Sequence, residues 1–429
     1  MTIRRRTAVV VALAALGACT PDPNAGKIQL RYMAWGNPEQ MALEEEFCRR
    51  FNAQNPDIHV RFFRVPQSAY GNKAIVMFAS RTAPDVVRID HYNFPNLVRK
   101  DYFLDLTPYA KKDPTFRESD YFPSAVRECY YNGRLYGLNV LFGSVILYYN
   151  QAMVRDAGLE DPYALWKRGE WTWDRFRNYA QSMSRFDERQ RPKRYGCTVP
   201  PFPLTTPVVW AFGGDLLTED GTKSLVGQKG AVDAYQFLAD LRWKHRCAPT
   251  PAQSANAAFT FESGKVGFEF NWMGMAPRYN QVIKGFDWDI VPLPKGPFGG
   301  RSIVKGNQLI VYRETKHPEA AWRFLRFMTS RGVETELYAV KRRCFPTRKD
   351  VAYSDDFLKP KTRPYQTDVF VKAVESAKEL PIGPRWGEWT NAFNMEVDNL
   401  FSGRERDASV VMKRAEAKVN EVLADEEGF

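Results

Sequence analysis

Histidine and cysteine are scarce in this chain, and their scarcity limits the chemistry that it can carry out. Four histidines and six cysteines occur among 429 residues, and no Cys-x-x-Cys pair is present. No two of the histidines stand at the spacing that metal ligands show. A zinc site is therefore not expected, and no metal ligand is predicted.

Five of the cysteines lie far apart in the body of the chain and leave the question of disulfides open. In an oxidising compartment one pair could form a bridge, and Cys197 with Cys247 is the candidate because both fall in the same predicted domain. Buried free thiols are the alternative, since cysteine packs as a small apolar residue. The five are Cys48, Cys129, Cys197, Cys247 and Cys344.

The common catalytic signatures are also missing. The chain contains no GxSxG, HExxH, GxGxxG or Walker motif. Gly264-Lys265 lies in FESGKVGF, without the spaced glycine and the following Ser or Thr that hold a phosphate. Carboxylates are plentiful, so a pair at glycosidase spacing stays open. No catalytic residue and no cofactor is predicted.

Long apolar runs and dense basic tracts are absent from the body of the chain. No segment after the first nineteen residues is long and apolar enough to span a membrane. The formal net charge is +11, with Lys and Arg scattered among acids and no basic tract interleaved with aromatic residues. Nucleic-acid binding is therefore not expected. A basic cleft for an acidic ligand stays open.

The first nineteen residues combine the features of a bacterial lipoprotein export signal. Arg4-Arg5-Arg6 precedes an uncharged run from Thr7 to Leu16, which is too short to cross a bilayer. Leu16-Gly17-Ala18-Cys19 then resembles a lipobox, whose cysteine receives the acyl chains that anchor such proteins. We predict a signal peptide at 1–18, lipidation of Cys19 and a tether at 19–26, with an ordinary secretory signal as the alternative. Cleavage removes three arginines and no acid, so the net charge falls from +11 to +8.

The remaining chain of roughly 400 residues exceeds what one hydrophobic core usually organises, so two domains are expected. Residues 28–34 alternate in polarity and predict a strand. Asn37-Pro38-Glu39-Gln40 supplies an N-cap, a proline at the first helical position and Gln at N3, so a helix begins there. Further strands at 58–62 and 85–90, with a helix at 70–80, complete a β-α-β-α-β unit. Such units form a parallel sheet with helices on both faces.

The rest of the chain continues this alternation of strands and helices. Strands are predicted at 145–149, 195–199, 266–270, 288–293 and 307–312, and helices at 151–157, 173–183, 230–244, 318–330, 389–400 and 411–422.

Four segments of the chain carry a resemblance to a known family, in the family's own order. They are Leu147 to Asn150 (LYYN) with Gly158, Pro162 and Trp171 to Asp174 (WTWD); Phe261 to Phe268 (FESGKVGF); Pro292 to Pro297 (PLPKGP); and Lys316 to Thr329 (KHPEAAWRFLRFMT). They resemble the corresponding elements of the family 1 extracellular solute-binding proteins, the receptors of ABC-type sugar importers. The resemblance covers nearly all of the mature chain.

The resemblance implies an α/β architecture of two lobes, the type II periplasmic-binding-protein fold. Each lobe is expected to be a mostly parallel sheet flanked by helices, and three hinge crossings join the two. Extended or Pro- and Gly-containing stretches near 137–145, 286–291 and 343–347 are the candidate crossings. Lobe 1 is then expected at 27–139 plus 288–343, and lobe 2 at 140–287 plus 344–425.

Ligands of open α/β sheets bind beyond the carboxyl ends of the strands. This rule, applied with the predicted crossings and the later segments, selects fourteen candidate ligand-binding residues. A sugar has apolar C–H faces and a ring of hydroxyl groups, so aromatic rings together with Asp, Asn, Gln and Arg side chains suit it. Core packing is the alternative for each single ring. The candidates are Trp35, Asn37, Gln67, Asp90, Tyr92, Asn139, Phe142, Phe212, Asn271, Trp272, Asn307, Arg343, Arg385 and Trp386.

We therefore expect a monomeric, lipid-anchored receptor of the cell envelope that faces the periplasm or the exterior. It would capture a mono- or oligosaccharide and deliver it to inner-membrane ABC permease subunits that work with a cytoplasmic ATPase. Only its lipid would contact the membrane, and no cofactor is expected. Two alternatives stay open: a surface glycan-degrading enzyme, and a receptor of the same fold for an anionic solute such as a sugar phosphate or a uronate. Arg88, Arg343 and Arg385 would suit the second.

Replacement of the predicted lipidated cysteine tests the anchor. In an expressing bacterium, Cys19→Ser should move the protein from the detergent phase to the aqueous phase on phase separation, because a serine receives no diacylglycerol. Its thermal unfolding should stay unchanged, since the predicted tether is too polar to join a core. Equal membrane retention of the variant and the wild type would contradict the prediction.

Overall fold

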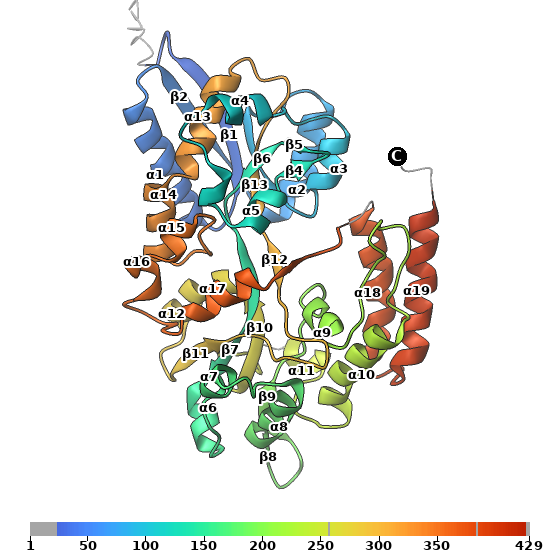
Figure 1. The fold of residues 1–429 in the computed structure, drawn as a ribbon. Helices are drawn as coiled ribbons and strands as arrows, with labels where there is room; N and C mark the ends of the chain where they lie inside the picture. The colour runs from blue at the N-terminus through green and yellow to red at the C-terminus, as the bar shows by residue number, and fades with distance from the viewer. Residues whose placement is uncertain (1–23, 256–257, 383–384, 426–429) are drawn as a thin grey trace, which may run out of the picture.

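The structure is a computed structural model that describes residues 24–255, 258–382 and 385–425. The predicted signal peptide, Cys19 and the first part of the tether lie outside the described residues. Two lobes, one above the other in Figure 1, each contain a sheet covered by helices. None of the helices in the described part of the chain is long and apolar enough to cross a membrane.

Lobe 1 contains a five-stranded sheet in the order β2-β1-β3-β13-β6. The first three strands are parallel, and β13 runs antiparallel to both of its neighbours. The strands are β1 (Ile28–Trp35), β2 (Ile58–Val65), β3 (Val86–Asp90), β6 (Gly137–Asn139) and β13 (Asn307–Val311). The predicted β-α-β-α-β unit is therefore confirmed.

The two faces of this sheet are covered by different helices. Successive side chains of β1 point to opposite faces, and apolar side chains of β1 are buried on both of them. Leu30 and Tyr32 pack with α1 (Pro38–Gln54) and α13 (Pro318–Met328), whereas Met33 points to the other face and packs with α2 (Gln67–Ala79) and α3 (Phe94–Arg99). The predicted cap of α1 is also confirmed. The side chain of Asn37 accepts from the Gln40 amide, and the Gln40 side chain accepts from the Asn37 amide.

Lobe 2 contains a second sheet in the order β14-β12-β7-β10-β9-β8, with β11 also paired to β7. The predicted mostly parallel arrangement does not hold here, because β7 runs antiparallel to β10, β11 and β12. The order of helices and strands along the sequence does not show that the central strand β7 runs antiparallel to its neighbours. The strands are β7 (Gly143–Asn150), β8 (Arg185–Phe186), β9 (Pro192–Cys197), β10 (Val266–Trp272), β11 (Trp288–Val291), β12 (Ile303–Lys305) and β14 (Lys378–Glu379).

Shorter elements and the helices of the second lobe complete the fold. In the first part of the chain these are α4 (Thr107–Lys112), η1 (Glu118–Asp120), α5 (Pro123–Arg127), β4 (Tyr130–Tyr131) and β5 (Arg134–Leu135). Further along are α6 (Gln151–Asp156), α7 (Pro162–Lys167), α8 (Trp173–Met183), α9 (Thr206–Ala211), α10 (Lys229–Trp243), α11 (Pro251–Ala255), η2 (Met273–Met275) and α12 (Ala276–Val282). The last are α14 (Arg331–Glu334), η3 (Thr335–Val340), α15 (Lys349–Ala352), α16 (Asp355–Leu358), α17 (Asp368–Glu375), α18 (Trp386–Ser402) and α19 (Ala408–Ala424).

The chain passes between the lobes at three places. The first is residues 140–142 between β6 and β7, the second is Gly306 between β12 and β13, and the third is the segment 341–367 between η3 and α17. The predicted second crossing near 286–291, and with it the boundary at 288, is wrong. Both β11 and β12 pair with β7, so the chain stays in lobe 2 until Gly306. A short apolar strand does not show by its pattern which sheet it joins.

The five cysteines in the described residues have free thiols. Cys197 and Cys247, the candidate pair, are both buried in the core of lobe 2, and the Cys197 thiol lies 3.6 Å from the carbonyl oxygen of Cys247. Burial raises the pKa of the Cys197 thiol well above its usual value.

One close packing contact in lobe 2 requires a glycine at position 196. A Cβ added at Gly196 on β9 would stand 1.8 Å from the carbonyl oxygen of Ala180 on α8, and backbone cannot yield as a side chain can. Gly196→Ala should therefore lower the free energy of unfolding by about 3 kcal/mol, measured by thermal or urea unfolding. Gly285→Ala is the control, because nothing lies within 4 Å of its added Cβ. Equal effects of the two variants would contradict the packing.

Candidate functional site

Three of the predicted residues meet at the strand ends of lobe 1. Trp35, Gln67 and Asp90 line one cavity of about 230 Å³, at the carboxyl ends of β1, β2 and β3. The ring of Trp35 lies 4.4 Å from that of Tyr70 and covers the guanidinium of Arg88, also at 4.4 Å. The strand-end rule thus selected residues that are 23 or more positions apart in sequence and that line the same cavity.

Aromatic rings from both lobes meet around one lysine. The Lys305 ammonium, at the end of β12, lies 4.2 Å from the ring centre of Tyr92 in lobe 1 and 5.7 Å from that of Trp272 in lobe 2. Tyr92 also stacks on Trp386 at the start of α18, with ring centres 5.1 Å apart and an angle of 5° between the planes. These three rings and Lys305 are here called the aromatic cluster. It joins the two lobes at the place where their strands end.

Hydrogen-bonding groups stand beside the aromatic cluster. Asp90 accepts from the Lys305 ammonium at 2.9 Å and from the backbone amide of Tyr92 at 3.1 Å. Asn307, at the start of β13, lies opposite Asp90 in the sheet, and with its amide nitrogen turned towards Asp90 it donates to the carboxylate at 3.3 Å. The Asp90 side chain is 29 % exposed, so it stays open to a further partner.

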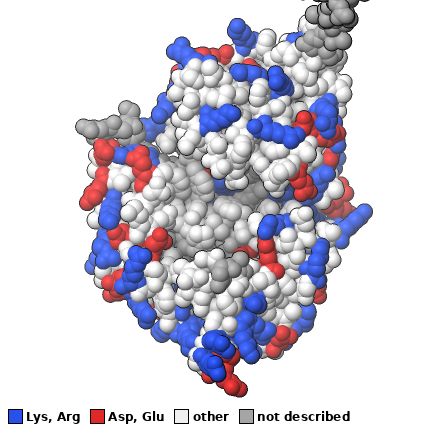
Figure 2. Space-filling model, turned by 180° about the vertical axis from the view of Figure 1, so that it is seen from behind, with Lys and Arg blue, Asp and Glu red and all other residues white. Residues whose placement is uncertain are grey.

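The molecule is hollowed where its lobes meet. Figure 2 shows a depression across the middle of the rear face, with mostly uncharged side chains inside it and charged side chains around its rim. A separate cavity of about 350 Å³ also lies between the lobes, where Asn37 and Gln40 of lobe 1 face Gly274 and Arg278 of lobe 2. Arg343, on the third crossing, lines this second cavity. Here it is called the hinge cavity.

Asn139 belongs to a buried polar network at the first two crossings. Its side-chain amide donates to Glu128 at 2.9 Å and to the carbonyl of Ala125 at 2.8 Å, and its oxygen accepts from Gln308 at 3.1 Å. Gln308 also reaches the His91 ring at 3.1 Å, and His91 lies 3.7 Å from Glu128. Asn139 is therefore placed to hold the crossings together.

Burial controls the charges in this network. It raises the pKa of Glu128 to about 8, and it lowers the pKa of His91 to about 4 together with the repulsion of nearby Lys305. At neutral pH both groups are therefore uncharged. One oxygen of Glu128 and one of Gln308 have no hydrogen-bond partner within the described part of the chain.

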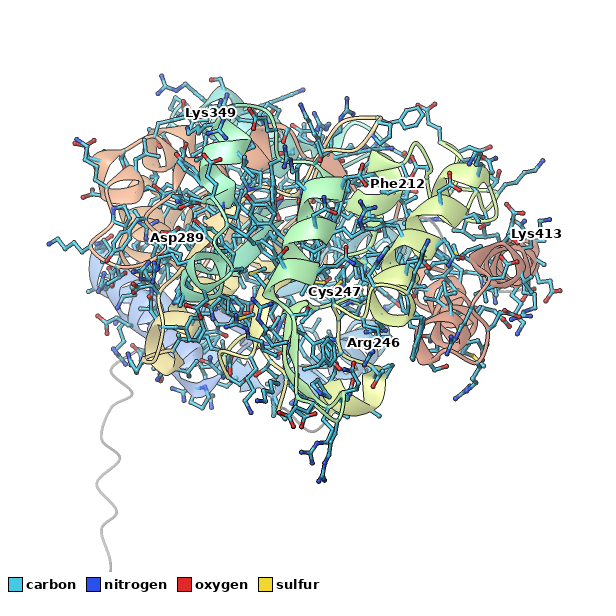
Figure 3. The ribbon with its side chains drawn as sticks, turned by 90° about the horizontal axis from the view of Figure 1, so that it is seen from below. Phe212, Arg246, Cys247, Asp289, Lys349 and Lys413 are labelled. Atoms are coloured by element: carbon cyan, nitrogen blue, oxygen red, sulfur yellow. The ribbon has the colours of Figure 1, made fainter. Side chains whose placement is uncertain are left out.

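Four predicted residues belong neither to the aromatic cluster nor to the two cavities and the buried network described above. Phe142 is fully buried against Phe345 in the core next to the crossings. Phe212 packs on Phe237 of α10, and Figure 3 shows it in lobe 2 between the part that carries Asp289 and the outer helix that carries Lys413. Both side chains therefore serve packing in this structure.

Asn271 and Arg385 are engaged by their own lobe. The Asn271 amide donates to the hydroxyl of Tyr279 at 3.2 Å, although Trp272 follows it directly. Arg385 donates to Glu388 at 2.7 Å and to the carbonyl of Val422 at 2.9 Å, so its guanidinium holds the end of α19. Because residues adjacent in a strand point to opposite faces, a strand end places only one of two neighbours in a cleft.

Sequence reasoning did not select Lys305, the residue at the centre of the aromatic cluster. It ends β12 directly before the second crossing at Gly306. The predicted boundary placed residues 288–343 in lobe 1. With that boundary, Lys305 is not at the end of a lobe 2 strand, so the strand-end rule did not select it. The signal that could have revealed it is the sequence Lys305-Gly306-Asn307, in which glycine separates two polar residues between apolar strands.

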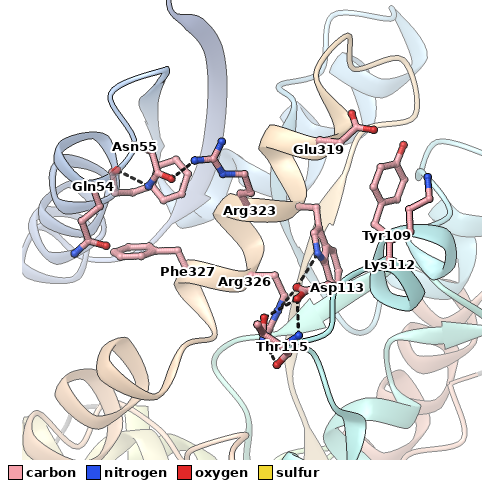
Figure 4. A pocket seen from close by; sticks show the side chains of 12 residues that line it. Gln54, Asn55, Tyr109, Lys112, Asp113, Thr115, Glu319, Arg323, Arg326 and Phe327 are labelled. Carbon is pink, nitrogen blue, oxygen red and sulfur yellow. Dashed lines mark hydrogen bonds and ion pairs between the residues drawn. The ribbon is translucent and has the colours of Figure 1, made fainter.

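A cavity of about 590 Å³ lies outside this region, on the surface of lobe 1 between α1, α4 and α13 (Figure 4). Its central polar groups bind one another. Asp113 accepts from Trp322 and from Arg326, each at 3.1 Å, and Arg323 donates to Asn55 at 2.6 Å. Among residues 24–255, 258–382 and 385–425, no group of three or more His, Cys, Asp or Glu side chains could hold a metal ion.

Comparison with known proteins gives a consistent result. The family model of the bacterial extracellular solute-binding proteins matches residues 35–335. A binding protein of Brucella abortus is 23 % identical over 99 % of this chain and 100 % of its own length, and the arabinooligosaccharide-binding protein of Bacillus subtilis is 24 % identical over 73 % and 72 %. An ABC substrate-binding protein of Listeria monocytogenes, solved in complex with cycloalternan, superposes with a TM-score of 0.82 at 21 % identity, covering 93 % of this chain and all of its own. The two-lobed fold is thus confirmed.

The buried network at the crossings predicts a pH dependence of stability. Glu128 takes up its proton more readily in the folded chain, with a pKa of about 8 against an ordinary 4.5. Between these values the unfolded chain ionises while the folded chain does not, so stability falls as pH rises, by up to about 1.4 kcal/mol per pH unit. Glu128→Gln, which mimics the neutral acid, should therefore gain stability over the wild type from pH 5 to pH 8 in thermal unfolding.

Glu44→Gln is the control, and for this variant we expect the opposite change in stability. Burial alone would raise the pKa of Glu44, but the guanidinium groups of Arg88 and Arg343 hold it below its usual value. This variant should therefore lose stability at neutral pH. A difference between Glu128→Gln and the wild type that does not change with pH would contradict a buried neutral acid.

Proposed function

The chain belongs to the bacterial extracellular solute-binding proteins, and we propose that it captures a mono- or oligosaccharide between its lobes and delivers it to an inner-membrane ABC permease. The observation that carries the proposal is the aromatic cluster. Its rings come from both lobes, and a carboxylate and an ammonium lie beside them. This combination matches the two surfaces of a sugar, which are the apolar C–H faces and the hydroxyl edge.

The relatives support a carbohydrate as the ligand. The Bacillus subtilis relative is named for arabinooligosaccharides, and the Listeria monocytogenes structure was solved with cycloalternan. In this chain Tyr92, Trp272 and Trp386 would offer flat faces for stacking. Asp90, Asn307 and Lys305 would offer acceptors and donors to hydroxyl groups.

Capture would proceed by closing of the lobes. A solute that contacts the strand ends of both lobes at once binds the closed form better than the open form, and it shifts the population by that difference in affinity. The Tyr92–Trp386 stack joins the lobes directly. A sugar ring that enters between Tyr92 and Trp386 would separate the two aromatic rings and contact each of them. The energy of closure is then supplied by the solute.

Binding and presentation would complete the task, and no bond of the solute is made or broken. The closed form would present the solute to permease subunits that work with a cytoplasmic ATPase. We propose that Cys19 carries the lipid that keeps the protein, as a monomer, at the membrane of the cell envelope. Neither a cofactor nor a metal enters this mechanism.

Removal of one ring of the aromatic cluster tests the proposal. Trp272→Ala should weaken binding of the oligosaccharide by roughly 1 to 3 kcal/mol, because the ring loses a desolvated contact with the sugar. The ligand would first be found by thermal shift across a panel of carbohydrates, since binding to the folded state alone raises its stability. Isothermal titration calorimetry then gives the affinities.

The matched control is Trp166→Ala. Trp166 is a partly buried ring of the same lobe on α7, next to Lys167, and it does not belong to the aromatic cluster. This variant should bind with the affinity of the wild type. If Trp272→Ala binds normally and melts much earlier than the wild type, then the ring serves packing and the assigned site is wrong.

A further inference from the structure

Two cysteines in the core of lobe 2 lie in contact with each other. Cys197 ends β9, and Cys247 lies just after α10. The backbone amide of Cys197 donates to the carbonyl oxygen of Cys247 at 3.0 Å. Burial raises the pKa of the Cys197 thiol, and a side-chain hydrogen bond with Cys247 raises it further, so the two thiols touch. Both side chains are fully buried, and both thiols are free in this structure.

The backbone geometry of the two residues suits a disulfide. Residues that are joined by a backbone hydrogen bond across neighbouring strands have α-carbons roughly 5.5 Å apart. Disulfides join residues whose α-carbons are about 4.4 to 6.8 Å apart. Because the two thiols already touch, a bond between Cys197 and Cys247 requires rotation of the side chains and no large movement of the backbone.

Both segments are held in place by groups other than the two sulfur atoms. The amides of Cys247 and Ala248 donate to the carbonyl oxygen of Leu241 in α10, at 2.8 Å and 3.2 Å. Cys197 is paired with Phe268 of β10 in the sheet. The fold of lobe 2 therefore brings the two cysteines side by side before any bond joins them.

The remaining three cysteines do not share this arrangement. The Cys129 thiol donates to the carbonyl oxygen of Ala125 at 3.5 Å, whereas Cys48 lies on α1 and Cys344 on the third crossing. Within the described residues, none of these three thiols hydrogen-bonds another cysteine. They therefore serve as internal controls for the pair in lobe 2.

We propose that Cys197 and Cys247 become joined by a disulfide when the chain folds in the oxidising cell envelope. The inference rests on the export that the proposed function requires, since disulfides persist outside the cytoplasm and are reduced inside it. The two residues are 50 positions apart, and the loop between them contains α9 and α10. The bond attaches the end of α10 to the end of β9 and restricts this loop in the unfolded chain.

The oxidant is another disulfide, carried by a thiol–disulfide oxidoreductase or by a small molecule such as glutathione disulfide. One cysteine loses its proton and attacks a sulfur of the oxidant, which releases one thiolate and leaves a mixed disulfide. The second cysteine loses its proton, attacks the sulfur of the first and releases the other thiolate. Two electrons and two protons have then passed to the oxidant. Because both thiols are inaccessible in the folded chain, this exchange takes place before the core of lobe 2 closes.

The first test maps the cysteines of the exported protein. Cells that express the full chain are fractionated, and protein from the envelope fraction is denatured with iodoacetamide, which alkylates free thiols. Trypsin then places Cys197 and Cys247 on different peptides, because Lys and Arg residues lie between them. Without reduction, mass spectrometry should find these two peptides linked and Cys48, Cys129 and Cys344 alkylated. Alkylated Cys197 and Cys247 in the envelope fraction would overturn the proposal.

The second test does not depend on export. The purified protein is unfolded, reduced and refolded in buffers with graded ratios of reduced glutathione to glutathione disulfide, and its thiols are then mapped in the same way. Cys197 and Cys247 should pair at a ratio at which Cys48, Cys129 and Cys344 remain thiols. A pair that stays reduced in an excess of glutathione disulfide would contradict the proposal.

Stability measurements separate a disulfide from two buried thiols. Under oxidising conditions, Cys197→Ala and Cys247→Ala should each lower the melting temperature by roughly 5 to 10 °C. The double variant should melt close to either single variant, because the first substitution already removes the bond. Cys129→Ala is the control, since it also removes a buried thiol, and its effect should not change on reduction. Additive effects of the two substitutions that are equal with and without reductant would indicate packing alone and overturn the disulfide.

The disulfide and the proposed function can fail separately. If the protein reaches the envelope and binds a sugar with both thiols free, then the disulfide is wrong and the proposed function stands. If the pair forms on refolding but the protein in cells is found only in the cytoplasm, then the export is wrong, and the proposed function fails with it.

Discussion

The hydrogen bonds that join the three crossings side by side are the constraint on which the rest of the structure depends. Phe142 bridges to Phe345, which brings the first crossing next to the third, and Gly143 pairs with Lys305, which brings it next to the second. Each lobe is built on a strand that leaves this junction, β7 below and β13 above (Figure 1). Because the crossings are neighbours, both sheets end at the same place, and their strand-end residues face a common cleft.

Two buried glutamates near the crossings show how neighbours decide the charge of the same side chain. Glu128 has amide partners, so burial dominates and keeps it protonated at neutral pH. Glu44 is as deeply buried but lies between two guanidinium groups, so it is ionised. The first therefore forms a neutral network that holds the crossings, whereas the second leaves a net positive charge at the third crossing. The neighbours of a buried carboxyl group, and not its burial alone, therefore decide its charge.

The sequence predicted the elements better than their assembly. The start of α1 was predicted correctly, because the cap formed by Asn37 and Gln40 depends only on residues that are neighbours in sequence. The antiparallel direction of β7 and the membership of β11 and β12 in the second sheet depend on contacts between distant segments, and no local pattern carries them. The strand-end rule selected Trp35, Asp90 and Trp272, which the structure places at the strand ends where the lobes meet. It could not distinguish them from Asn271 or Arg385, whose partners come from the folded lobe.

The position of Lys305 explains in physical terms why the proposed solute would bind the closed form better. Its ammonium lies on rings of both lobes and on Asp90, so a neutral sugar that enters must take over these contacts, and the lysine must then find other oxygens. Hydroxyl groups of the solute can serve as those oxygens. Such a sugar would gain affinity from hydrogen bonds to Lys305 and from stacking on rings of both lobes, and only closed lobes offer these contacts at once.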